Sequence, residues 1–480
     1  MTLSIQPSNI LVCEFWNVSP HLDAGIEIAI DAALSGYKVH YLFIGDLLPF
    51  CECYIPPTGN QRRESSAIRA AQGYLHRLGC HNLTIADDQT AIQCSLNTVQ
   101  FDLSSIKCIQ ELKAFRIGER VIGDYLYSNL CDYANTAHPD LSASQSILSS
   151  MLNSYLFAYN ILLYYATRHS FSRVYLFNGR YIYAQGVVRA CHELAIPVRY
   201  HERGCDLNTI LLRPFCPHSL NDTKADIQRV WTNGKARYGL NTMIKIGSSW
   251  FNDRIHSGSA VIGEKILQFS NQSDIIRTLS ENKSSGNHIW SYFWSSEDEY
   301  IGLPQDIYPL RGWQDQRSAI LDLLSVSYYM DSKVTLVVRL HPNLRYKADI
   351  DKFISTTLRN ISNIVLIDSE SSVSSYDLIR VSNIVFSCGS TISAEACYMG
   401  TPSVLMASGL YEDLHPIIKV FSYKDLTQFI ANLRAGIKLN TSSLDILKFG
   451  AYWRLRARRL KYFTVHNYFS SFFSGTSQVI

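Results

Sequence analysis

Several features that would reveal a function directly are missing from this sequence. No Asp-x-Asp metal site stands out, and there is no internal repeat or low-complexity tract. The first basic residue is Lys38, so we expect no secretory signal with a basic leading region and place the protein in the cytoplasm. The twelve cysteines are scattered, which favours reduced thiols. Cys51, Cys53 and Cys80 fit no standard zinc spacing, and we expect neither a metal nor a cofactor.

Charge and long apolar runs are also scarce. Only 18% of the 480 residues are charged and the net charge is +3, which gives no reason to expect a nucleic-acid partner. The longest uncharged stretch, residues 141–167, contains Ser, Gln, Asn, Tyr and Thr, and we predict a buried helix there rather than a membrane span. A folded chain of this length exceeds one ordinary core and predicts two domains of about 200 residues each.

Strand, helix and strand patterns alternate in the first half of the chain. Two such β-α-β units are present, at residues 10–44 and 174–201, with largely helical sequence at residues 61–168 between them. Consecutive β-α-β units build a parallel sheet with right-handed crossovers. We therefore predict a Rossmann-like domain over residues 1–215.

The second half predicts a similar domain with flanking segments. Residues 216–285 hold Asn, Ser, Lys and Gly in excess, and we expect them to connect the domains, with a helical stretch at residues 259–282. A second Rossmann-like domain is expected over residues 286–430, because β-branched strands again alternate with helical patterns. Residues 431–480 are predicted to be helical, above all residues 447–473, and to cross back to the first domain.

Polar residues follow the β-branched strand at 334–338 of the second domain. The run Arg-Leu-His-Pro-Asn at 339–343 lies where a parallel strand ends, and this edge is where α/β proteins bind ligands. Histidine donates to phosphate oxygens, and proline fixes the direction of the chain after the strand. The alternative is a capping histidine in a tight turn, with the arginine paired to a carboxylate. We interpret four of these residues as nucleotide-binding: Arg339, His341, Pro342 and Asn343.

A second cluster opens a helix after the strand at 384–386. Gly389 allows close backbone approach, and Ser390 is the expected N-cap. Free N–H groups and partial positive charge at a helix start suit a phosphate, so Ser390 and Thr391 are candidate donors. Glu395 lies one turn further and is a candidate acceptor for ribose hydroxyls. The alternative is ordinary capping, with Glu395 as an acid favoured by the helix dipole.

A third strand of this domain is expected to end at Phe293, shortly before Ser295 and Ser296. The two hydroxyls can reach a phosphate, whereas the acids at residues 297–299 would repel it. We expect those acids to orient basic groups or to bind sugar hydroxyls. Acids in the first turn of a helix are the simpler alternative.

In the first domain, Glu202 follows the strand at residues 198–201. We predict that it projects from the carboxyl edge of the sheet, where a carboxylate can serve as a general base or a nucleophile. The alternative is an ion pair with Arg203 in a loop.

Asn178 and Arg180 end the neighbouring strand in the same way. They are candidates for shaping the acceptor pocket, and a simple turn with Gly179 explains them equally well. The candidate donor or acceptor contacts in full are Asn178, Arg180, Arg203, Gly204, Ser295 and Ser296.

With these residues in view, the sequence resembles the capsule polysaccharide biosynthesis proteins, a group that includes bacterial β-Kdo transferases of capsule export. Three motifs carry the resemblance, which covers about residues 174–405: a (K/R)-x-H-P strand end, an S-(S/T)-x-x-x-E-A-x-x-x-G-x-P helix, and an acidic E-x-G after a strand of the first domain. The family's acidic pair before that glycine is Glu-Arg in this chain. The matching residues are Arg339, His341, Pro342, Ser390, Thr391, Glu395, Ala396, Gly400, Pro402, Glu202 and Gly204.

The resemblance implies an α/β glycosyltransferase of the GT-B class, with two Rossmann-like domains facing a cleft. The second domain would bind a nucleotide-sugar donor such as CMP-Kdo, and the first a glycan or lipid-linked glycan acceptor. Glu202 would be the leading catalytic carboxylate with His341, and positive groups and helix starts would replace a metal at the leaving phosphate. The alternatives are a CDP-glycerol-type glycerophosphotransferase, a hydrolysing nucleotide-sugar epimerase and a noncatalytic partner in polysaccharide assembly.

Six Lys or Arg residues lie between residues 448 and 461 with no acid among them, interleaved with aromatic residues. Each basic residue near an anionic surface is worth about 1 kcal/mol, and aromatic rings favour the headgroup zone. The pattern suggests peripheral membrane contact through residues 448–463. The alternative is a helix that packs on the first domain with its arginines paired.

Overall fold

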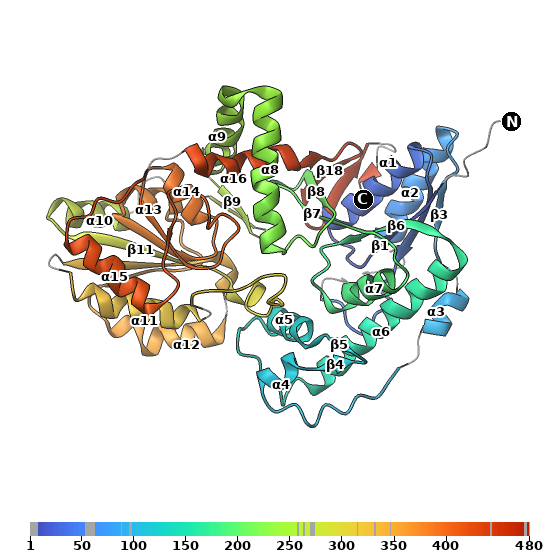
Figure 1. Ribbon diagram of the computed structural model, residues 1–480, viewed down its shortest axis with the longest axis horizontal. Helices are drawn as coiled ribbons and strands as arrows, with labels where there is room; N and C mark the ends of the chain where they lie inside the picture. Colours follow the sequence, from blue (N-terminus) through green and yellow to red (C-terminus); the bar gives the residue numbers. More distant parts are fainter. Residues whose placement is uncertain are drawn as a thin grey trace. The chain divides into compact units, whose positions relative to one another are not determined.

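The computed structural model divides the chain into two compact units (Figure 1). The first comprises Met1–Ala134, Pro139–Ser219 and Arg456–Ile480, and the second comprises Asn135–His138 and Leu220–Leu455. The chain therefore leaves the first unit, builds the second and returns. The described residues are 8–52, 63–87, 89–95, 98–256, 259–262, 265–268, 274–313, 315–330, 333–345, 347–441, 444–474 and 478–479.

A seven-stranded sheet forms the centre of the first unit. Its strand order is β17-β8-β7-β6-β1-β2-β3, and the five neighbours from β7 to β3 run parallel. This topology confirms the Rossmann-like domain expected for the first half. The elements are β1 (Asn9–Glu14), α1 (His21–Leu34), β2 (Lys38–Phe43), β3 (Leu83–Ile85), α6 (Gln145–Arg168), β6 (Phe171–Phe177), α7 (Ile182–Glu193), β7 (Val198–Arg203), β8 (Thr209–Arg213) and β17 (Arg458–Arg459).

Helices α6 and α7 approach each other closely. A Cβ added at Gly186 of α7 would lie 2.3 Å from the backbone oxygen of Tyr155 in α6, so only glycine fits at that crossing. Among the described helices, α6 is long and apolar enough to cross a membrane by length and composition, with half of its most apolar window buried. Its buried residues recur at helical spacing from Leu148 to Tyr165. The helix predicted over residues 141–167 is therefore present as a packed helix of the first unit.

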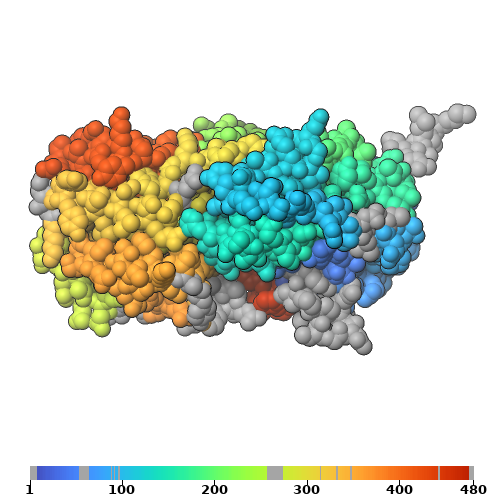
Figure 2. All heavy atoms as spheres, turned by 90° about the horizontal axis from the view of Figure 1, so that it is seen from below, coloured from blue at the N-terminus to red at the C-terminus, as the bar shows by residue number. Residues whose placement is uncertain are grey.

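The stretch expected to be largely helical, residues 61–168, also contains strands. Besides β3, a small antiparallel pair is formed by β4 and β5. Figure 2 shows that the residues coloured cyan and teal, from about 100 to 168, gather in one patch on the face seen from below. The further elements of this stretch are α2 (Arg63–Arg77), α3 (Gln89–Ser95), α4 (Ile109–Lys113), β4 (Arg116–Ile117), β5 (Arg120–Val121) and α5 (Gly123–Ala134).

A six-stranded parallel sheet forms the centre of the second unit, in the order β13-β12-β11-β14-β15-β16. Strand β12 is buried at every position, as expected for a sheet covered on both faces. The second Rossmann-like domain is thereby confirmed. The elements are β11 (His288–Trp294), η1 (Glu297–Glu299), α11 (Gln316–Ser327), β12 (Val334–Leu340), η2 (Pro342–Leu344), α12 (Ala348–Thr356), η3 (Leu358–Asn360), β13 (Ile364–Ile367), α13 (Ser375–Val381), β14 (Ile384–Cys388), α14 (Ile392–Tyr398), β15 (Ser403–Ala407), β16 (Ile418–Lys419) and α15 (Tyr423–Arg434).

The segment expected to connect the domains, residues 216–285, lies mostly in the second unit. Its largest part is a helical hairpin made of α8 (Leu220–Tyr238) and α9 (Leu240–His256), seen side by side in Figure 1. The helix expected at residues 259–282 is wrong in its first part, because β9 (Ser259–Ile262) and β10 (Lys265–Gln268) form an antiparallel pair before α10 (Asp274–Ser284). The β-branched residues of this pair favour strands over helix.

The last segment is helical for a shorter distance than expected. Helix α16 ends at Arg456, so the helix predicted over residues 447–473 is wrong beyond that point. Phe463 and Val465 are buried while the residues between and after them are exposed, which is the alternation of a half-buried strand. The chain crosses back to the first unit as strands, with β17 pairing antiparallel to β8. The elements are η4 (Leu444–Ile446), α16 (Leu447–Arg456), β18 (Phe463–Asn467), β19 (Ser470–Phe473) and β20 (Gln478–Val479).

Acidic residues of α1 hold the returning strands. The buried carboxylate of Glu27 accepts hydrogen bonds from the backbone N–H of Lys461 at 2.7 Å and of Tyr462 at 3.1 Å. One turn further along α1, Asp31 pairs with Arg458 at 2.8 Å and with the Lys461 ammonium at 3.0 Å. Burial raises the pKa of Glu27, and the two backbone donors and the Arg458 charge act against that shift.

Acids of the protein also engage other basic residues of the segment 448–461. Lys448 pairs with Asp445, and Arg454 pairs with Asp253. With the two cations at Asp31, at least four of the six basic residues have carboxylate partners. This pairing agrees with the alternative of paired arginines, and membrane contact through residues 448–463 stays a prediction.

We predict that Glu27→Ala destabilises the protein by about 2 kcal/mol or more, because it leaves two backbone N–H groups without their buried acceptor. Urea unfolding of the whole chain measures the change. The control is Asp31→Asn, which removes a more exposed acid from the same face of α1 and should cost less than about 1 kcal/mol. If the two substitutions lower the free energy of unfolding equally, the backbone contacts of Glu27 contribute no more to stability than the contacts of Asp31.

Candidate functional site

Three of the expected motifs meet at one edge of the second sheet. Strand β11 lies between β12 and β14 and runs parallel to both, so the residues that follow these strands are neighbours. The backbone N–H of His341 donates to the carbonyl of Trp294 at 2.9 Å. The hydroxyl of Ser295 donates to the carbonyl of Cys388 at 3.0 Å. These bonds join the three strand ends into one rigid edge.

His341 presents a neutral imidazole at this edge. Its Nδ1 accepts a hydrogen bond from the backbone N–H of Asn343 at 3.1 Å, which leaves the proton on Nε2. Desolvation by the surrounding protein, followed by the charges of Arg339 and Lys347, lowers the pKa of His341 to about 4. The residue is nevertheless exposed. A neutral imidazole with a free Nε2–H donor can hydrogen-bond a phosphate oxygen without carrying a charge.

Arg339 has a different role from the one expected. It is buried, and its guanidinium donates to the backbone carbonyls of Asp368 and, at 3.1 Å, of Ser371. Burial lowers its pKa to about 10. Arg339 therefore holds the loop after β13, and among the described residues its guanidinium has backbone carbonyls as partners, where the alternative expected a carboxylate. We leave it out of the proposed ligand contacts.

The helix after β14 begins one residue later than expected. Its N-cap is Thr391 rather than Ser390, and Ser390 Oγ accepts from the backbone N–H of Ile392 at 3.4 Å. Gly389 has a φ of +74°, and a Cβ there would meet the carbonyl oxygen of Ser408 at 3.1 Å. The close approach expected of Gly389 is thus present in the backbone. Helix α14 is only seven residues long, so side chains must supply most of any positive charge here.

That charge comes from Arg254 of α9, which the sequence did not reveal. Its Nε donates to Glu395 Oε1 at 2.9 Å, and its Nη2 lies 3.5 Å from Thr391 Oγ1. Glu395 is 1% exposed and also accepts from Thr391 Oγ1 at 3.0 Å. The expected ribose acceptor is therefore a buried carboxylate that fixes a half-exposed arginine beside the start of α14. Arg254 lies some 140 residues before its partner, and no local motif marks it.

The serines after β11 differ in their surroundings. Ser295 is tied to the sheet, whereas Ser296 is 5% exposed and its Oγ has no hydrogen-bond partner among the residues that the structure describes. A buried hydroxyl without a partner is costly unless a ligand or water satisfies it. Ser296 is therefore a strong candidate for a contact with a bound molecule.

The acids at 297–299 engage protein groups. Glu297 accepts from the backbone N–H of Gln316 at 3.0 Å, and burial raises its pKa to about 7. Asp298 forms a buried ion pair with Lys347, and Glu299 accepts from the amide of Asn343 at 3.2 Å. These contacts agree with the expectation from the sequence that the acids orient neighbouring groups.

In the first unit, Glu202 lies inside a strand rather than in a loop beyond it. Strand β7 continues to Arg203 and pairs with β8 as an antiparallel hairpin, which the pattern at residues 198–201 did not indicate. Glu202 Oε2 accepts from Asn178 Nδ2 at 2.6 Å, and its Oε1 lies 4.0 Å from His21 Nδ1. Burial, then the charges of His201 and Arg203, holds the pKa of His21 well below its usual value.

Asn178 is the centre of this cluster and has a left-handed backbone, with φ of +59°. Its Nδ2 also lies 3.1 Å from His218 Nε2, and its Oδ1 accepts from the backbone N–H of Arg180 at 3.1 Å. Burial, followed by the charges of Arg180 and Arg213, lowers the pKa of His218 to about 3. Asn178 therefore joins the Glu202 carboxylate on one side to the imidazole of His218 on the other.

The remaining candidates of the first unit have structural contacts. Arg180 is buried and pairs with Asp132, and Arg203 donates to the hydroxyl of Tyr468. At Gly204 a Cβ would lie 2.4 Å from Thr209 Oγ1, which explains the glycine at the hairpin turn.

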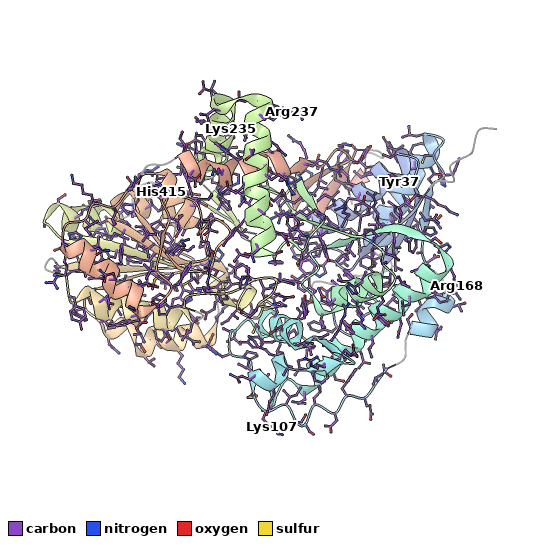
Figure 3. All side chains as sticks on the ribbon, in the orientation of Figure 1. Tyr37, Lys107, Arg168, Lys235, Arg237 and His415 are labelled. Carbon is purple, nitrogen blue, oxygen red and sulfur yellow. The ribbon has the colours of Figure 1, made fainter. Side chains whose placement is uncertain are left out.

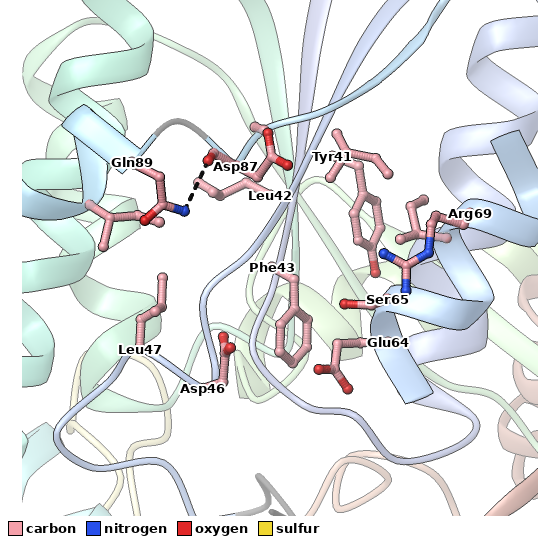
Figure 4. A pocket seen from close by; sticks show the side chains of 14 residues that line it. Tyr41, Leu42, Phe43, Asp46, Leu47, Glu64, Ser65, Arg69, Asp87 and Gln89 are labelled. Atoms are coloured by element: carbon pink, nitrogen blue, oxygen red, sulfur yellow. Dashed lines mark hydrogen bonds between the residues drawn. The ribbon is translucent and has the colours of Figure 1, made fainter. Parts of the chain in front are cut away.

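A separate pocket of about 220 Å³ lies at the carboxyl ends of β2 and β3 (Figure 4). Asp46 and Glu64 lie on either side of the Phe43 ring, and Arg69 and Ser65 lie near the Tyr41 hydroxyl. This hydroxyl is buried and has no hydrogen-bond partner among the described residues. The lining residues are Tyr41, Leu42, Phe43, Asp46, Leu47, Glu64, Ser65, Ile68, Arg69, Ile85, Ala86, Asp87, Gln89 and Ile92.

Within the described residues, no group of three or more His, Cys, Asp or Glu side chains could hold a metal ion. An Asp-x-Asp sequence does occur, at Asp349 and Asp351 of α12, where Asp349 accepts from Thr136 and pairs with Arg317. Of the cysteines considered for a metal, Cys53 lies outside the described residues.

The chain matches no model of a known protein family. It also matches no curated protein by sequence. Among solved structures it is similar to KpsC of Thermosulfurimonas dismutans, a β-Kdo 2,7 transferase, at 13% identity and a TM-score of 0.34, over 60% of this chain and 79% of that one. It is also similar to the UDP-GlcNAc 2-epimerase of Neisseria meningitidis bound to UDP-GlcNAc, at 12% identity and a TM-score of 0.31, over 92% of this chain and 97% of that one. A third similar structure is MurG of Acinetobacter baumannii, at 11% identity and a TM-score of 0.25, over 93% of this chain and 94% of that one.

The class of this protein follows from the topology of its own chain. Two Rossmann-like sheets follow each other along the sequence, and the last strands return to the first unit. The two sheets and this return define a GT-B-like α/β protein.

We predict that acid weakens the folded state between pH 6.5 and pH 4. His341 and His218 have folded pKa values of about 4 and about 3, below the unfolded value of about 6.5. The stabilisation from neutral imidazoles is fully present above pH 6.5 and is lost as the pH falls toward these values. Urea unfolding at several pH values should show a shallower decline for His341→Gln than for the original chain. Parallel curves would contradict a lowered pKa at His341.

Proposed function

We propose that this protein is a glycosyltransferase that moves a sugar from a nucleotide donor to a glycan or lipid-linked glycan acceptor in surface polysaccharide synthesis. The observation that carries the proposal is the edge of the second sheet, where three strand ends gather hydrogen-bond donors beside a carboxylate-fixed arginine. A CMP-sugar such as CMP-Kdo is the donor favoured by the motifs at 339–343 and 389–402.

In this proposal the donor phosphate lies among Nε2–H of His341, the hydroxyls of Ser296 and Ser390, and the guanidinium of Arg254. The first three groups are neutral donors, and Arg254 supplies the positive charge. As the sugar leaves, negative charge grows on the phosphate, and fixed donors and a cation stabilise it. The Glu395–Arg254 pair supports a reaction in which protein groups take the part of a metal at the phosphate.

On the first unit, Glu202 is the candidate general base toward an acceptor hydroxyl. Its carboxylate is about one quarter exposed, and Asn178 orients it through a 2.6 Å hydrogen bond. The pocket at β2 and β3 carries carboxylates and an aromatic ring, which suit the hydroxyls and apolar faces of a sugar. We propose this pocket as part of the acceptor site.

The nucleotide can be identified by thermal-shift measurements with CMP, CDP, UDP and GDP. A site-specific ligand at a hundredfold excess over its Kd stabilises the folded state by about 2.7 kcal/mol. We expect the largest shift with CMP. A preference for CDP would favour a glycerophosphotransferase, and conversion of a sugar nucleotide without an acceptor would reveal an epimerase. No shift with any nucleotide would leave a noncatalytic assembly partner.

We predict that His341→Ala and Ser390→Ala each weaken nucleotide binding about tenfold or more, because a hydrogen bond to a charged group contributes about 1.5–3 kcal/mol. Isothermal titration calorimetry measures the affinity, and circular dichroism checks the fold. The control is Arg359→Gln, which removes an exposed cation elsewhere on the same unit. Unchanged affinity in both alanine variants would refute the phosphate site.

We predict that Glu202→Gln keeps the nucleotide affinity and loses most of the turnover, since the substitution preserves shape but removes the base. Single-turnover kinetics with a defined acceptor measure the loss. Glu119→Gln removes an exposed acid from the same unit and should retain the original rate. If Glu202→Gln also retains it, Glu202 is structural and Asp298 or Glu299 must be tested as the base.

A further inference from the structure

The hairpin of α8 and α9 carries an unusual distribution of charge. Residues 227–252 contain no Asp or Glu. Of their four cations, Arg229 pairs with Asp226, and the other three are Lys235, Arg237 and Lys245. All three cations are exposed, and none has an ion-pair partner among the described residues. The acids that flank the run, Asp226 and Asp253, lie at least about 12 Å away along the helices, at 1.5 Å per residue.

Exposed apolar side chains lie at the turn between the two helices. Tyr238 is 42% exposed and Leu240 is 44% exposed, on either side of Gly239, which has a φ of +79° and open space around its Cβ position. Figure 3 shows Lys235 and Arg237 at this end of the hairpin. We call residues 235–245 the hairpin tip. It combines cations with an aromatic and an aliphatic side chain at its apex.

The hairpin is fixed to the rest of the second unit close to its tip. A Cβ on Gly450 of α16 would lie 2.2 Å from the backbone oxygen of Gly247 in α9, so the two helices cross at glycines. Between α8 and α9, a Cβ on Gly234 would lie 2.5 Å from the sulfur of Met243. The inner apolar face is thus buried, and the tip is presented on a rigid support.

We propose that the hairpin tip binds the surface of an anionic lipid membrane. Uncompensated cations are attracted to anionic headgroups within a Debye length of about 8 Å at physiological salt. A tyrosine and a leucine at the apex suit the interface between headgroups and acyl chains. A nucleic acid would also bind the cations, but it would not account for the exposed leucine beside them. The cations of residues 448–461 are less suited, because four of them face carboxylates of the protein.

The test is co-sedimentation of the full-length protein with vesicles, and it does not depend on the proposed reaction. The protein should bind vesicles that contain phosphatidylglycerol, not vesicles of phosphatidylcholine alone, and added salt should release it. Each cation at an anionic surface changes partitioning about fivefold, so Lys235→Gln, Arg237→Gln and Lys245→Gln together should weaken binding about a hundredfold. Tyr238→Ser with Leu240→Ser should weaken binding even at low salt.

A matched triple variant controls for net charge. Lys352→Gln, Lys424→Gln and Lys438→Gln remove three exposed cations from other surfaces of the same unit and should bind vesicles as the original chain does. The proposal is overturned if the original chain does not bind anionic vesicles at low salt, or if both triple variants lose binding equally. Loss of heparin binding in the tip variant, without any vesicle binding by the original chain, would also overturn it and point to a soluble polyanion.

Discussion

Buried carboxylates need partners, and this constraint fixes the edges of both sheets. Glu14 at the end of β1 pairs with His201 of β7 inside the first sheet, where both side chains are fully buried. Gly25 of α1 is required by the same pair, because a Cβ there would lie 2.1 Å from the Glu14 carboxylate. In the second unit, Glu395 fixes Arg254 in a similar way. Removing one partner from such a pair leaves a buried charge, at a cost of about 3–5 kcal/mol.

The constraint also explains why the arginine of the candidate site lies on a distant helix. Glu395 is buried within the first turn of α14, and a cation must reach it from outside that helix. Arg254 does so from α9 and remains 42% exposed, so the same side chain neutralises the acid and offers positive charge to solvent. Helix α9 is in turn held by its glycine crossing with α16. The position of the cation therefore depends on three helices that are far apart in the sequence.

The sequence predicted the parts of the site that belong to parallel strands, since a β-branched run followed by polar residues marks a strand end without further knowledge. His341, Ser296 and Ser390 were found in this way. Glu202 was predicted just after its strand, whereas β7 continues through it to Arg203, because the hairpin with β8 depends on pairing with residues that show no parallel β-α-β pattern. Arg254 was not predicted at all, because the sequence does not distinguish an arginine of an amphipathic helix from a solvated surface cation. The strands after residue 456 were missed because their basic residues resemble a helix surface, and their acidic partners lie more than 400 residues earlier.

The return of the last strands to the first unit has a consequence for synthesis. A ribosome makes α1 early, but the backbone groups that satisfy Glu27 emerge only with residues 461 and 462. While the second unit is being translated, the Glu27 carboxylate lacks its backbone donors and the outer edge of β8 lacks its partner strand. An unpaired strand edge of this kind can pair with the wrong strand. The first half of the protein is thus the last to be completed. A chain cut before β17 would expose this edge permanently, so the two units cannot be separated by a single break in the sequence.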